Sequence, residues 1–378
     1  MTKEEAILLA EKVVSGTATD EELLQYNQLF NAFQQQGGWD ESLLGNKQQL
    51  ESAIRQRLQP VLERRRSGWV TGWYKWAAAA AVALLFGTGY YFYGHRQPAV
   101  LAPQAIRFKN DIVAPAGNHA VLTLGNGQQI LLDTAGNGTL AIQGQTSVSK
   151  NANGQIIYNG AGNDVGFNTI QVPNGSKPLA VVLGDGTKVW IDAGSALTYP
   201  AAFNGTKREV SAAGQVYFEV TQNSNQPFVV KSATSKTTIE VLGTAFNLRS
   251  FKDEEETKVT LVSGAVKVNT AGASQLLHPG EQAAATTGGA IQLIANADLQ
   301  QVTAWKEGMF FFNGADITTI MSELQRYYNI DVDFQTDVKD FFVAKIPRDV
   351  PVSQILNLLE MTNLVHFKIE GRKITVIK

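Results

Sequence analysis

The residue types that most often carry catalysis or bind metals are few and scattered in this chain. Cysteine is absent, which excludes disulfides, thiolate metal sites and cysteine nucleophiles. None of the histidines has a second ligand at a spacing that zinc sites use. They are His95, His119, His278 and His366, each in a different segment. The sequence therefore predicts neither a metal site nor a cofactor.

Three further groups could act on a substrate, and each also has a structural interpretation. Ser195 lies in Ala-Gly-Ser, without the Gly-x-Ser-x-Gly elbow of serine hydrolases. Asp185 and Asp192 could form a carboxylate pair, but Asp185 stands in a Gly-Asp-Gly turn, where aspartate serves the backbone. Trp190 and Tyr217 could stack on a sugar, although aromatic residues on half-buried strands more often pack against their neighbours. No catalytic group can be assembled from these residues, so an enzyme is not predicted.

One stretch, Trp76–Gly94, carries no charge and is mostly apolar. Its length is close to the roughly 20 residues that a helix needs to cross a bilayer. Aromatic residues crowd both ends, acidic residues are absent between Glu63 and Asp111, and basic residues gather on the N-terminal side. The positive-inside rule then places residues 1–75 in the cytoplasm and residues 95–378 outside it. A cleaved signal peptide and a buried core helix are the alternatives to a single membrane span.

Residues 1–66 are expected to form three short helices. Thr2 with Glu5, and Thr19 with Glu22, have the spacing of capping boxes at the starts of the first two. The second helix has one apolar stripe at i, i+3, i+4 and i+7, formed by Tyr26, Leu29, Phe30 and Phe33. So small a bundle buries only a marginal core. The stripe is therefore completed either by a partner or within a self-sufficient bundle.

The region from 115 to 295 has the pattern of an all-β domain. Short, alternately apolar runs recur about every 10 residues and are bounded by Gly, Asn or Asp, which predicts an antiparallel sandwich or jelly roll. A strand, Gly-x-Gly turn, strand unit around Gly125-Asn-Gly127 recurs around Gly184-Asp-Gly186. Glycine supplies the positive φ that such hairpin turns need. The acidic run Asp253–Glu256 is expected on an exposed hairpin tip rather than in a metal site.

The β region also carries a series of motifs in a fixed order, which resembles the FecR family of membrane-bound anti-sigma factors. The motifs are Leu183–Ser195 with Tyr199-Pro200, Gly214–Val220, Pro227–Val230, Val241–Asn247, Ser263–Val266 and Pro279–Glu281. The upstream half-repeat and the C-terminal region look like the longer, Bacteroidota-type members. The resemblance implies a transmembrane regulator whose cytoplasmic end holds an extracytoplasmic-function sigma factor. Its periplasmic end would receive a signal from a TonB-dependent outer-membrane transducer.

The resemblance also draws attention to the Gly243-Thr244 bond. The resemblance implies that the chain could cleave itself at this bond, as some family members do. The Thr244 hydroxyl would attack the preceding carbonyl of Gly243, and water would hydrolyse the resulting ester. The alternative is a tight turn between two strands, for which glycine is equally suited. The sequence favours the turn, and no other catalytic residue is predicted.

The C-terminal region, 303–378, changes its apolar period. A strand at Phe310–Phe312 is followed by a helical stripe from Ile317 to Tyr328 and by an alternating strand at Ile330–Phe334. A second strand–helix–strand unit begins at Phe341 and ends in a hairpin. This plan looks like the short N-terminal domain that secretins and TonB-dependent transducers share. The residues predicted to receive the signal are Phe310, Phe312, Ile330 and Val332; the alternative is a module that only caps the β domain.

The sequence therefore predicts a multidomain fold with five parts. They are a small N-terminal all-α bundle (1–66), one transmembrane helix with basic and aromatic flanks (67–95), a linker (96–114), an all-β sandwich or jelly-roll-like periplasmic domain (115–295) and a small α+β domain of two βαβ units (303–378). The predicted location is the inner membrane, with the N-terminus in the cytoplasm and the C-terminus in the periplasm.

The predicted function is that of an anti-sigma factor. It would sequester its sigma factor through the stripe of the second helix, and membrane proteases would release it after the transducer docks on the C-terminal domain. The net charge of −2 gives no indication of direct nucleic-acid binding. The alternative is a membrane-tethered module whose β domain binds a glycan through exposed aromatic residues.

Overall fold

The computed structural model divides the chain into two compact units, residues 1–110 and 111–378. It describes the second unit except residues 153 and 160–165. In the first unit it describes Glu5, Leu8, Leu9, Lys12, Thr19, Glu22, Gln25 and Tyr26. The predicted span, Trp76–Gly94, lies outside the described residues. Within the described part of the chain, no helix has the length and apolar character needed to cross a bilayer.

The described residues of the first unit confirm one predicted capping box. The Glu22 amide donates to the Thr19 hydroxyl at 3.3 Å, and the Thr19 amide donates to the Glu22 carboxylate at 2.9 Å. Lys12 pairs with the same carboxylate, and this hydrogen bond is the main reason that the pKa of Glu22 is lowered. Tyr26 is helical and half-buried. Leu29, Phe30 and Phe33, the rest of the predicted stripe, lie outside the described residues.

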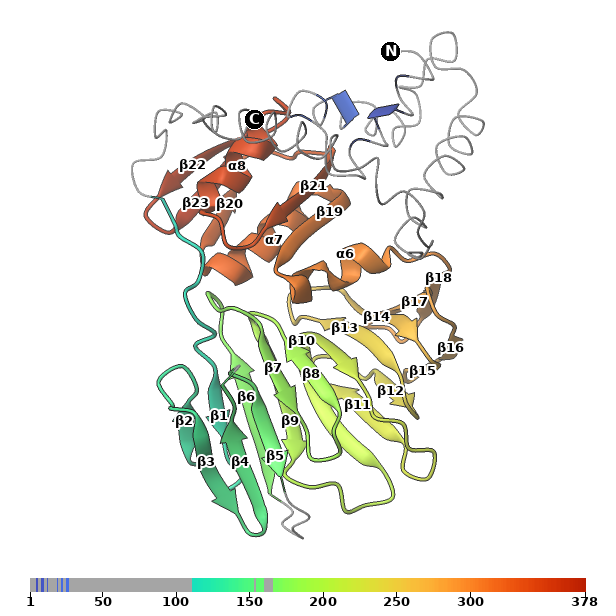
Figure 1. Cartoon of the computed structure of the whole chain (residues 1–378). Coiled ribbons are helices and arrows are strands. Elements are labelled where there is room, and N and C mark those ends of the chain that lie inside the picture. The colour runs from blue at the N-terminus through green and yellow to red at the C-terminus, as the bar shows by residue number, and fades with distance from the viewer. Residues whose placement is uncertain are drawn as a thin grey trace, which may run out of the picture. The chain divides into compact units, whose positions relative to one another are not determined.

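The strands that follow form one 18-stranded sheet, here called the β module. They are β1 (Val121–Thr123), β2 (Gln129–Leu131), β3 (Gly138–Gln143), β4 (Thr146–Lys150), β5 (Ile156–Asn159), β6 (Phe167–Val172), β7 (Leu179–Val182), β8 (Lys188–Ile191), β9 (Ser195–Pro200), β10 (Arg208–Glu219), β11 (Phe228–Ser232), β12 (Thr238–Val241), β13 (Ala245–Ser250), β14 (Glu256–Ser263), β15 (Val266–Asn269), β16 (Ser274–Leu277), β17 (Gln282–Thr286) and β18 (Ile291–Ile294). Figure 1 shows these strands as one body.

The long strand β10 connects two halves of this sheet. Its first part pairs with β9 and β11, and its second part pairs with β8 and β13. Between the two parts Gly214 has φ +82°, and a Cβ there would lie 2.3 Å from the Ser195 hydroxyl. Glycine is therefore required where β10 turns from one half to the other. Apolar side chains of both halves, such as Leu197 and Val189, share one buried core.

The two copies of the predicted repeat form hairpins with the same turn. In the first turn the Leu124 amide donates to Gln128 at 2.8 Å, and in the second the Leu183 amide donates to Thr187 at 2.9 Å. The last glycine of each turn is left-handed, with φ +85° and +81°. The first hairpin joins β1 to β2 and the second joins β7 to β8. The prediction of a repeated hairpin is therefore confirmed.

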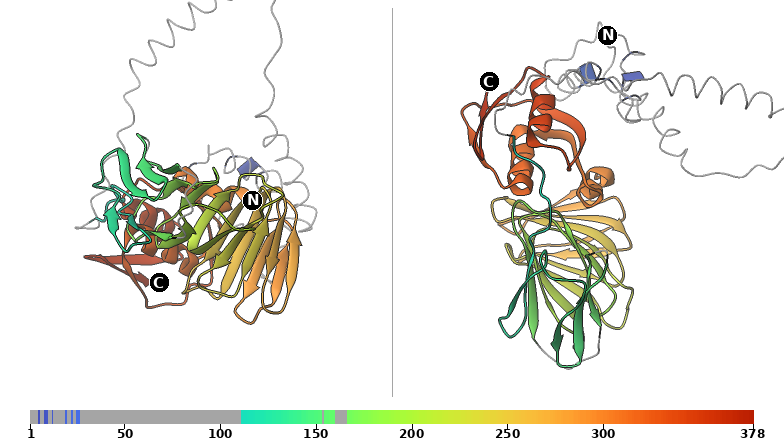
Figure 2. Two further views of the ribbon diagram at one scale, coloured as in Figure 1. Left: turned by 90° about the horizontal axis from the view of Figure 1, so that it is seen from below. Right: turned by 60° about the vertical axis from the view of Figure 1, so that its left-hand side comes forward.

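The remaining elements form the C-terminal module. They are α6 (Leu299–Thr303), the 3-10 helix η1 (Ala304–Glu307), β19 (Met309–Asp316), α7 (Ile317–Tyr328), β20 (Asp331–Phe334), β21 (Phe341–Pro347), α8 (Val352–Glu360), β22 (His366–Glu370) and β23 (Lys373–Ile377). β19 pairs with β21, and β23 lies between β20 and β22. The apolar stripe predicted for α7 is buried in a core of its own. Figure 2 shows the module from two further sides.

The fold class predicted from the sequence is wrong. Strands hold 45% of the described residues, the large sheet is nearly barrel-like, and no N-terminal all-α bundle is described. Two parallel pairings, β5 with β7 and β10 with β11, also depart from an antiparallel sandwich or jelly roll. In the C-terminal module, α7 joins β19 to β20 in a different sheet, so the two units are not βαβ units. Apolar periodicity indicates the type of each element, whereas pairing depends on contacts distant in the sequence.

Candidate functional site

The β module and the C-terminal module meet at a joint made largely of charged side chains. Asp192, just after β8, accepts two hydrogen bonds from Nη1 of Arg348, just after β21, at 2.8 and 3.1 Å. Both side chains are buried. The Arg348 guanidinium also lies over the rings of Phe310 and Tyr327, 4.6 and 5.1 Å from their centroids. This pair fixes the first point of contact between the two modules.

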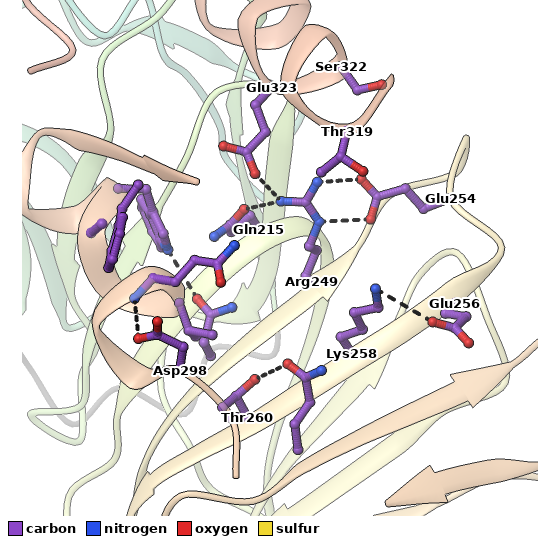
Figure 3. Close-up of a pocket in the computed structure, with 18 of the residues that line it drawn as sticks. Gln215, Arg249, Glu254, Glu256, Lys258, Thr260, Asp298, Thr319, Ser322 and Glu323 are labelled. Carbon is purple, nitrogen blue, oxygen red and sulfur yellow. Dashed lines mark hydrogen bonds and ion pairs between the residues drawn. The ribbon is translucent and has the colours of Figure 1, made fainter. Parts of the chain in front are cut away.

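Arg249 on β13 forms the second contact of the joint. Its guanidinium donates to both oxygens of Glu254, at 2.8 and 2.7 Å, and to Glu323 of α7 at 2.9 Å. It also donates to the Gln215 side chain at 3.1 Å. Figure 3 shows Arg249 at the centre of these three partners. Burial opposes the charge of Arg249, but Glu323 and Glu254 outweigh it and raise its pKa.

Arg326 of α7 forms the third contact. It donates to Asp253 at 2.8 Å and lies 3.0 Å from Glu254. Its guanidinium carbon is 3.7 Å from the centroid of the Phe251 ring, which is a close cation–π contact. The acidic run was predicted to be a solvated hairpin tip, and Asp253 is indeed exposed, but Glu254 is mostly buried between two arginines. The loop therefore takes part in the joint.

Trp305 and Lys306 of η1 cover the outer face of the sheet. The Trp305 indole N–H donates to the Asn247 side chain of β13 at 3.2 Å, and both residues are buried. The Lys306 ammonium lies 4.7 and 4.8 Å from the ring centroids of Trp190 and Tyr217. These two rings face each other across β8 and β10 in an edge-on pair. Burial raises the pKa of Tyr217 to about 12. The predicted packing role of both aromatic residues is confirmed.

A cleft of about 790 Å³ opens beside the joint. Its lining is mainly polar and includes Arg249, Lys258, Thr260, Gln282 and Glu323. In Figure 3, Lys258 points to Glu256, and the Thr260 hydroxyl donates to Gln282 at 2.7 Å. No group of three or more His, Cys, Asp or Glu side chains that could hold a metal occurs among the described residues. The chemistry that the joint offers is charge pairing and hydrogen bonding.

The carboxylate pair considered from the sequence does not exist. Asp192 binds Arg348, whereas Asp185 accepts from the Thr187 amide at 3.0 Å and from Arg208 at 2.7 Å. Arg208 is 1% exposed. Ser195 accepts a hydrogen bond from the Gln215 amide at 2.8 Å and donates weakly to a carbonyl. All of these groups are engaged in the fold.

The Gly243-Thr244 bond lies in a bend before β13. A Cβ on Gly243 would lie 2.7 Å from the Gln222 backbone, so the close approach itself requires glycine. The Thr244 hydroxyl is buried and donates to the Ala265 carbonyl at 3.0 Å. These contacts give both residues a structural role. Self-cleavage stays a prediction.

The four residues predicted to receive a signal lie in the C-terminal module. Phe310, Phe312 and Ile330 are buried in its core, and Val332 is half-buried against it. Their side chains therefore stabilise the module, and a partner could reach these strands only along a backbone edge.

The arginines of the joint were missed by the sequence interpretation. Arg249, Arg326 and Arg348 each pair with a carboxylate that is distant in the sequence, so no local pattern indicates the joint. Arg208 did carry a signal, because it is in phase with the inward residues Val210 and Ala212 of β10.

Comparison with known proteins identifies both modules. Residues 168–267 match the family described as FecR protein, and residues 309–376 match the one described as FecR, C-terminal. The chain contains both FecR-family domains. The first match covers β6 to β15, and the second begins at β19 and ends in β23. The joint therefore connects two family domains.

Two crystal structures are similar to this FecR-family chain. Both are of a proposed anti-sigma factor from Parabacteroides distasonis ATCC 8503, at 1.65 and 2.50 Å resolution. Each is 28% identical, with TM-scores of 0.51 and 0.52, and covers 56% of this chain and 98% or 99% of its own. No curated protein matches the chain.

Proposed function

We propose that this FecR-family protein is an anti-sigma factor. The observation that carries the proposal is the likeness to a proposed anti-sigma factor over nearly all of that protein's length, at 28% identity. The two family matches in the expected order give it further support. An anti-sigma factor implies a sigma factor as partner.

In the finer proposal, the partner is an extracytoplasmic-function sigma factor bound by the first unit in the cytoplasm. The apolar stripe Tyr26, Leu29, Phe30 and Phe33 would provide the contact. Residues 76–94 would cross the inner membrane, and residues 111–378 would lie in the periplasm. This arrangement rests on the charge asymmetry and apolar length of the sequence.

The signal would come from a TonB-dependent outer-membrane transducer that docks on the C-terminal module. Among the described strands, β20 and β22 pair with β23 alone, so each has one open edge. An open edge can accept a strand from a partner protein. Docking would strain the charged joint with the β module, and membrane proteases would then release the first unit with its sigma factor.

Co-purification of the sigma factor with the full chain tests this proposal. A tagged full chain should capture a sigma factor identified by mass spectrometry. Replacement of Tyr26, Leu29, Phe30 and Phe33 by alanine should abolish the capture, because it removes the apolar contact. The matched control is Gln25→Ala, whose side chain is exposed. Absence of any sigma factor from the wild-type sample would overturn the proposal.

A further inference from the structure

The first residues of the second unit cross the C-terminal module before they enter the β module. Residues 111–117, here called the strap, contain no helix or strand. Figure 1 shows the strap as the teal segment that passes the C-terminal module and then descends to β1. The strap therefore touches the last module of the unit before the chain forms the first strand.

Asp111 at the start of the strap caps helix α8. Its carboxylate accepts hydrogen bonds from the Ser353 amide at 3.2 Å and from the Ser353 hydroxyl at 2.5 Å. The Val352 amide donates to the Ile112 carbonyl at 2.9 Å. The residue at the N-cap of α8 is Pro351, which offers no side-chain cap. The strap thus supplies the acceptors that the first turn of α8 lacks.

The side chains of the strap alternate between buried and exposed. Ile112 is 6% exposed and belongs to the core of the C-terminal module, and Ala114 packs against that core. Val113 between them is 73% exposed. The strap therefore lies in the module as an extended chain with one face inserted.

The far end of the strap is attached to the β module. The Gly117 carbonyl accepts from the Lys177 amide at 2.8 Å. The next two amides, of Asn118 and His119, donate to the Asp133 carboxylate at 3.2 and 3.0 Å. If the C-terminal module moves away from the β module, the strap cannot keep both attachments.

We propose that the strap is a masked cleavage segment, which the C-terminal module keeps closed. Its role in the cell rests on the function proposed above. An endopeptidase binds its substrate as an extended chain free of other contacts, so cleavage requires local opening of the strap. Opening breaks the Asp111 cap, the Val352 hydrogen bond and the burial of Ile112. Movement of the C-terminal module removes all three together when the strap stays attached to the β module through Gly117, Asn118 and His119.

The cleavage step is ordinary peptide hydrolysis by an endopeptidase. The oxygen of a water molecule adds to a carbonyl carbon of the strap, and the bond to the following nitrogen breaks. The nitrogen leaves with a proton as a new amino terminus. The cut separates residues before the strap from the whole second unit. The last module of the chain thereby controls whether the two units stay connected.

Limited proteolysis of the full chain with subtilisin tests the proposal, with the cut bonds identified by mass spectrometry. Ile112→Ser and Asp111→Ala should each be cut between residues 111 and 117 about tenfold faster than wild type, because cleavage follows the open population. Ser353→Ala removes one donor of the cap from the other side and should act in the same direction. Val113→Ser is the matched control and should leave the rate unchanged.

Hydrogen exchange of the same variants distinguishes local opening of the strap from global unfolding. The amides of α7 and β21 should stay as protected as in wild type. The proposal would be overturned if the strap were cut at the same rate in wild type and Ile112→Ser. It would also be overturned if the strap were cut faster in Val113→Ser than in wild type. If the strap is cut equally but the wild-type chain captures its sigma factor, only the strap proposal fails.

Discussion

The two cores of the second unit differ in kind from the joint between them. The cores are apolar and buried, with Phe246 in one and Phe342 in the other fully enclosed. The joint is held by arginine–carboxylate pairs and by arginines stacked on aromatic rings. Burial of apolar side chains stabilises a core without requiring specific paired partners. Polar and charged interfaces between domains are typical of domains that move relative to each other. In the mechanism proposed above, the two cores stay folded and the modules separate at the joint.

A core truncation should give the largest loss of stability. Phe246 stacks on Phe218 with ring centroids 5.0 Å apart. Phe246→Ala should lower the free energy of unfolding by about 4 kcal/mol, because it removes buried area and leaves a cavity. Urea denaturation measures the change. Leu242→Ala, at an exposed position, should cost less than about 0.5 kcal/mol, and equal losses would contradict the assignment of the core.

Removal of Asp192 should weaken the joint and leave both cores intact. Asp192→Ala strands the buried Arg348 charge, which costs about 3 kcal/mol. Hydrogen exchange should then quicken at the Gly175 amide, which donates to the Arg326 carbonyl across the joint at 2.8 Å. Amides of β13 and β19 should keep their protection. If those core amides lose protection as well, the joint is not a separable interface.

Alkaline pH should destabilise the β module, because it ionises tyrosines that are buried in the core. Burial raises the pKa of Tyr158 to about 12, and Tyr199, which hydrogen-bonds to it at 2.8 Å, has its pKa raised further. A folded-state pKa above the unfolded value of about 10 favours the protonated form in the fold. The contribution of these tyrosines to the free energy of unfolding is therefore fully present below about pH 10. It is lost as the pH rises through about 12, and the loss for Tyr158 is ~3 kcal/mol. Urea denaturation across this range should show a smaller loss in Tyr158→Phe.

The hydrogen bond of Trp305 should make the smallest contribution. Trp305→Phe keeps most of the buried ring but leaves the Asn247 oxygen without its indole donor. The expected cost is about 1 kcal/mol, measured by urea denaturation. A change of several kcal/mol would mean that η1 determines the position of the C-terminal module more strongly than the arginines do.

The sequence predicted those features that depend on neighbouring residues. The Gly-x-Gly hairpins, the Thr19–Glu22 capping box and the buried stripe of α7 each follow from spacing within a few residues. The turn role of Asp185 was also predicted, because aspartate next to glycine favours a turn whatever lies around it. Its partner Arg208 was not, although the inward phase of that residue was readable.

The features that the sequence could not predict depend on distant contacts. At Gly214, strand β10 passes from one half of the sheet to the other. The need for glycine there comes from the close contact with Ser195, which is distant in the sequence. Arg348 and Asp192 are 156 residues apart in the sequence, so neither indicates the other. The strap shows the same limit, since Asp111 caps a helix near the opposite end of the unit. Register and sheet order, which made the predicted fold class wrong, belong to the same kind of contact.

A charge exchange across the joint tests most directly whether separation of the modules controls the sigma factor. A sigma-dependent reporter should be low in cells with the wild-type chain and high with Asp192→Arg, which places two positive charges together. The double variant Asp192→Arg with Arg348→Asp restores an opposite pair and should return the reporter to the wild-type level. A wild-type level in the single variant, or a high level that the double variant does not reduce, would contradict the account.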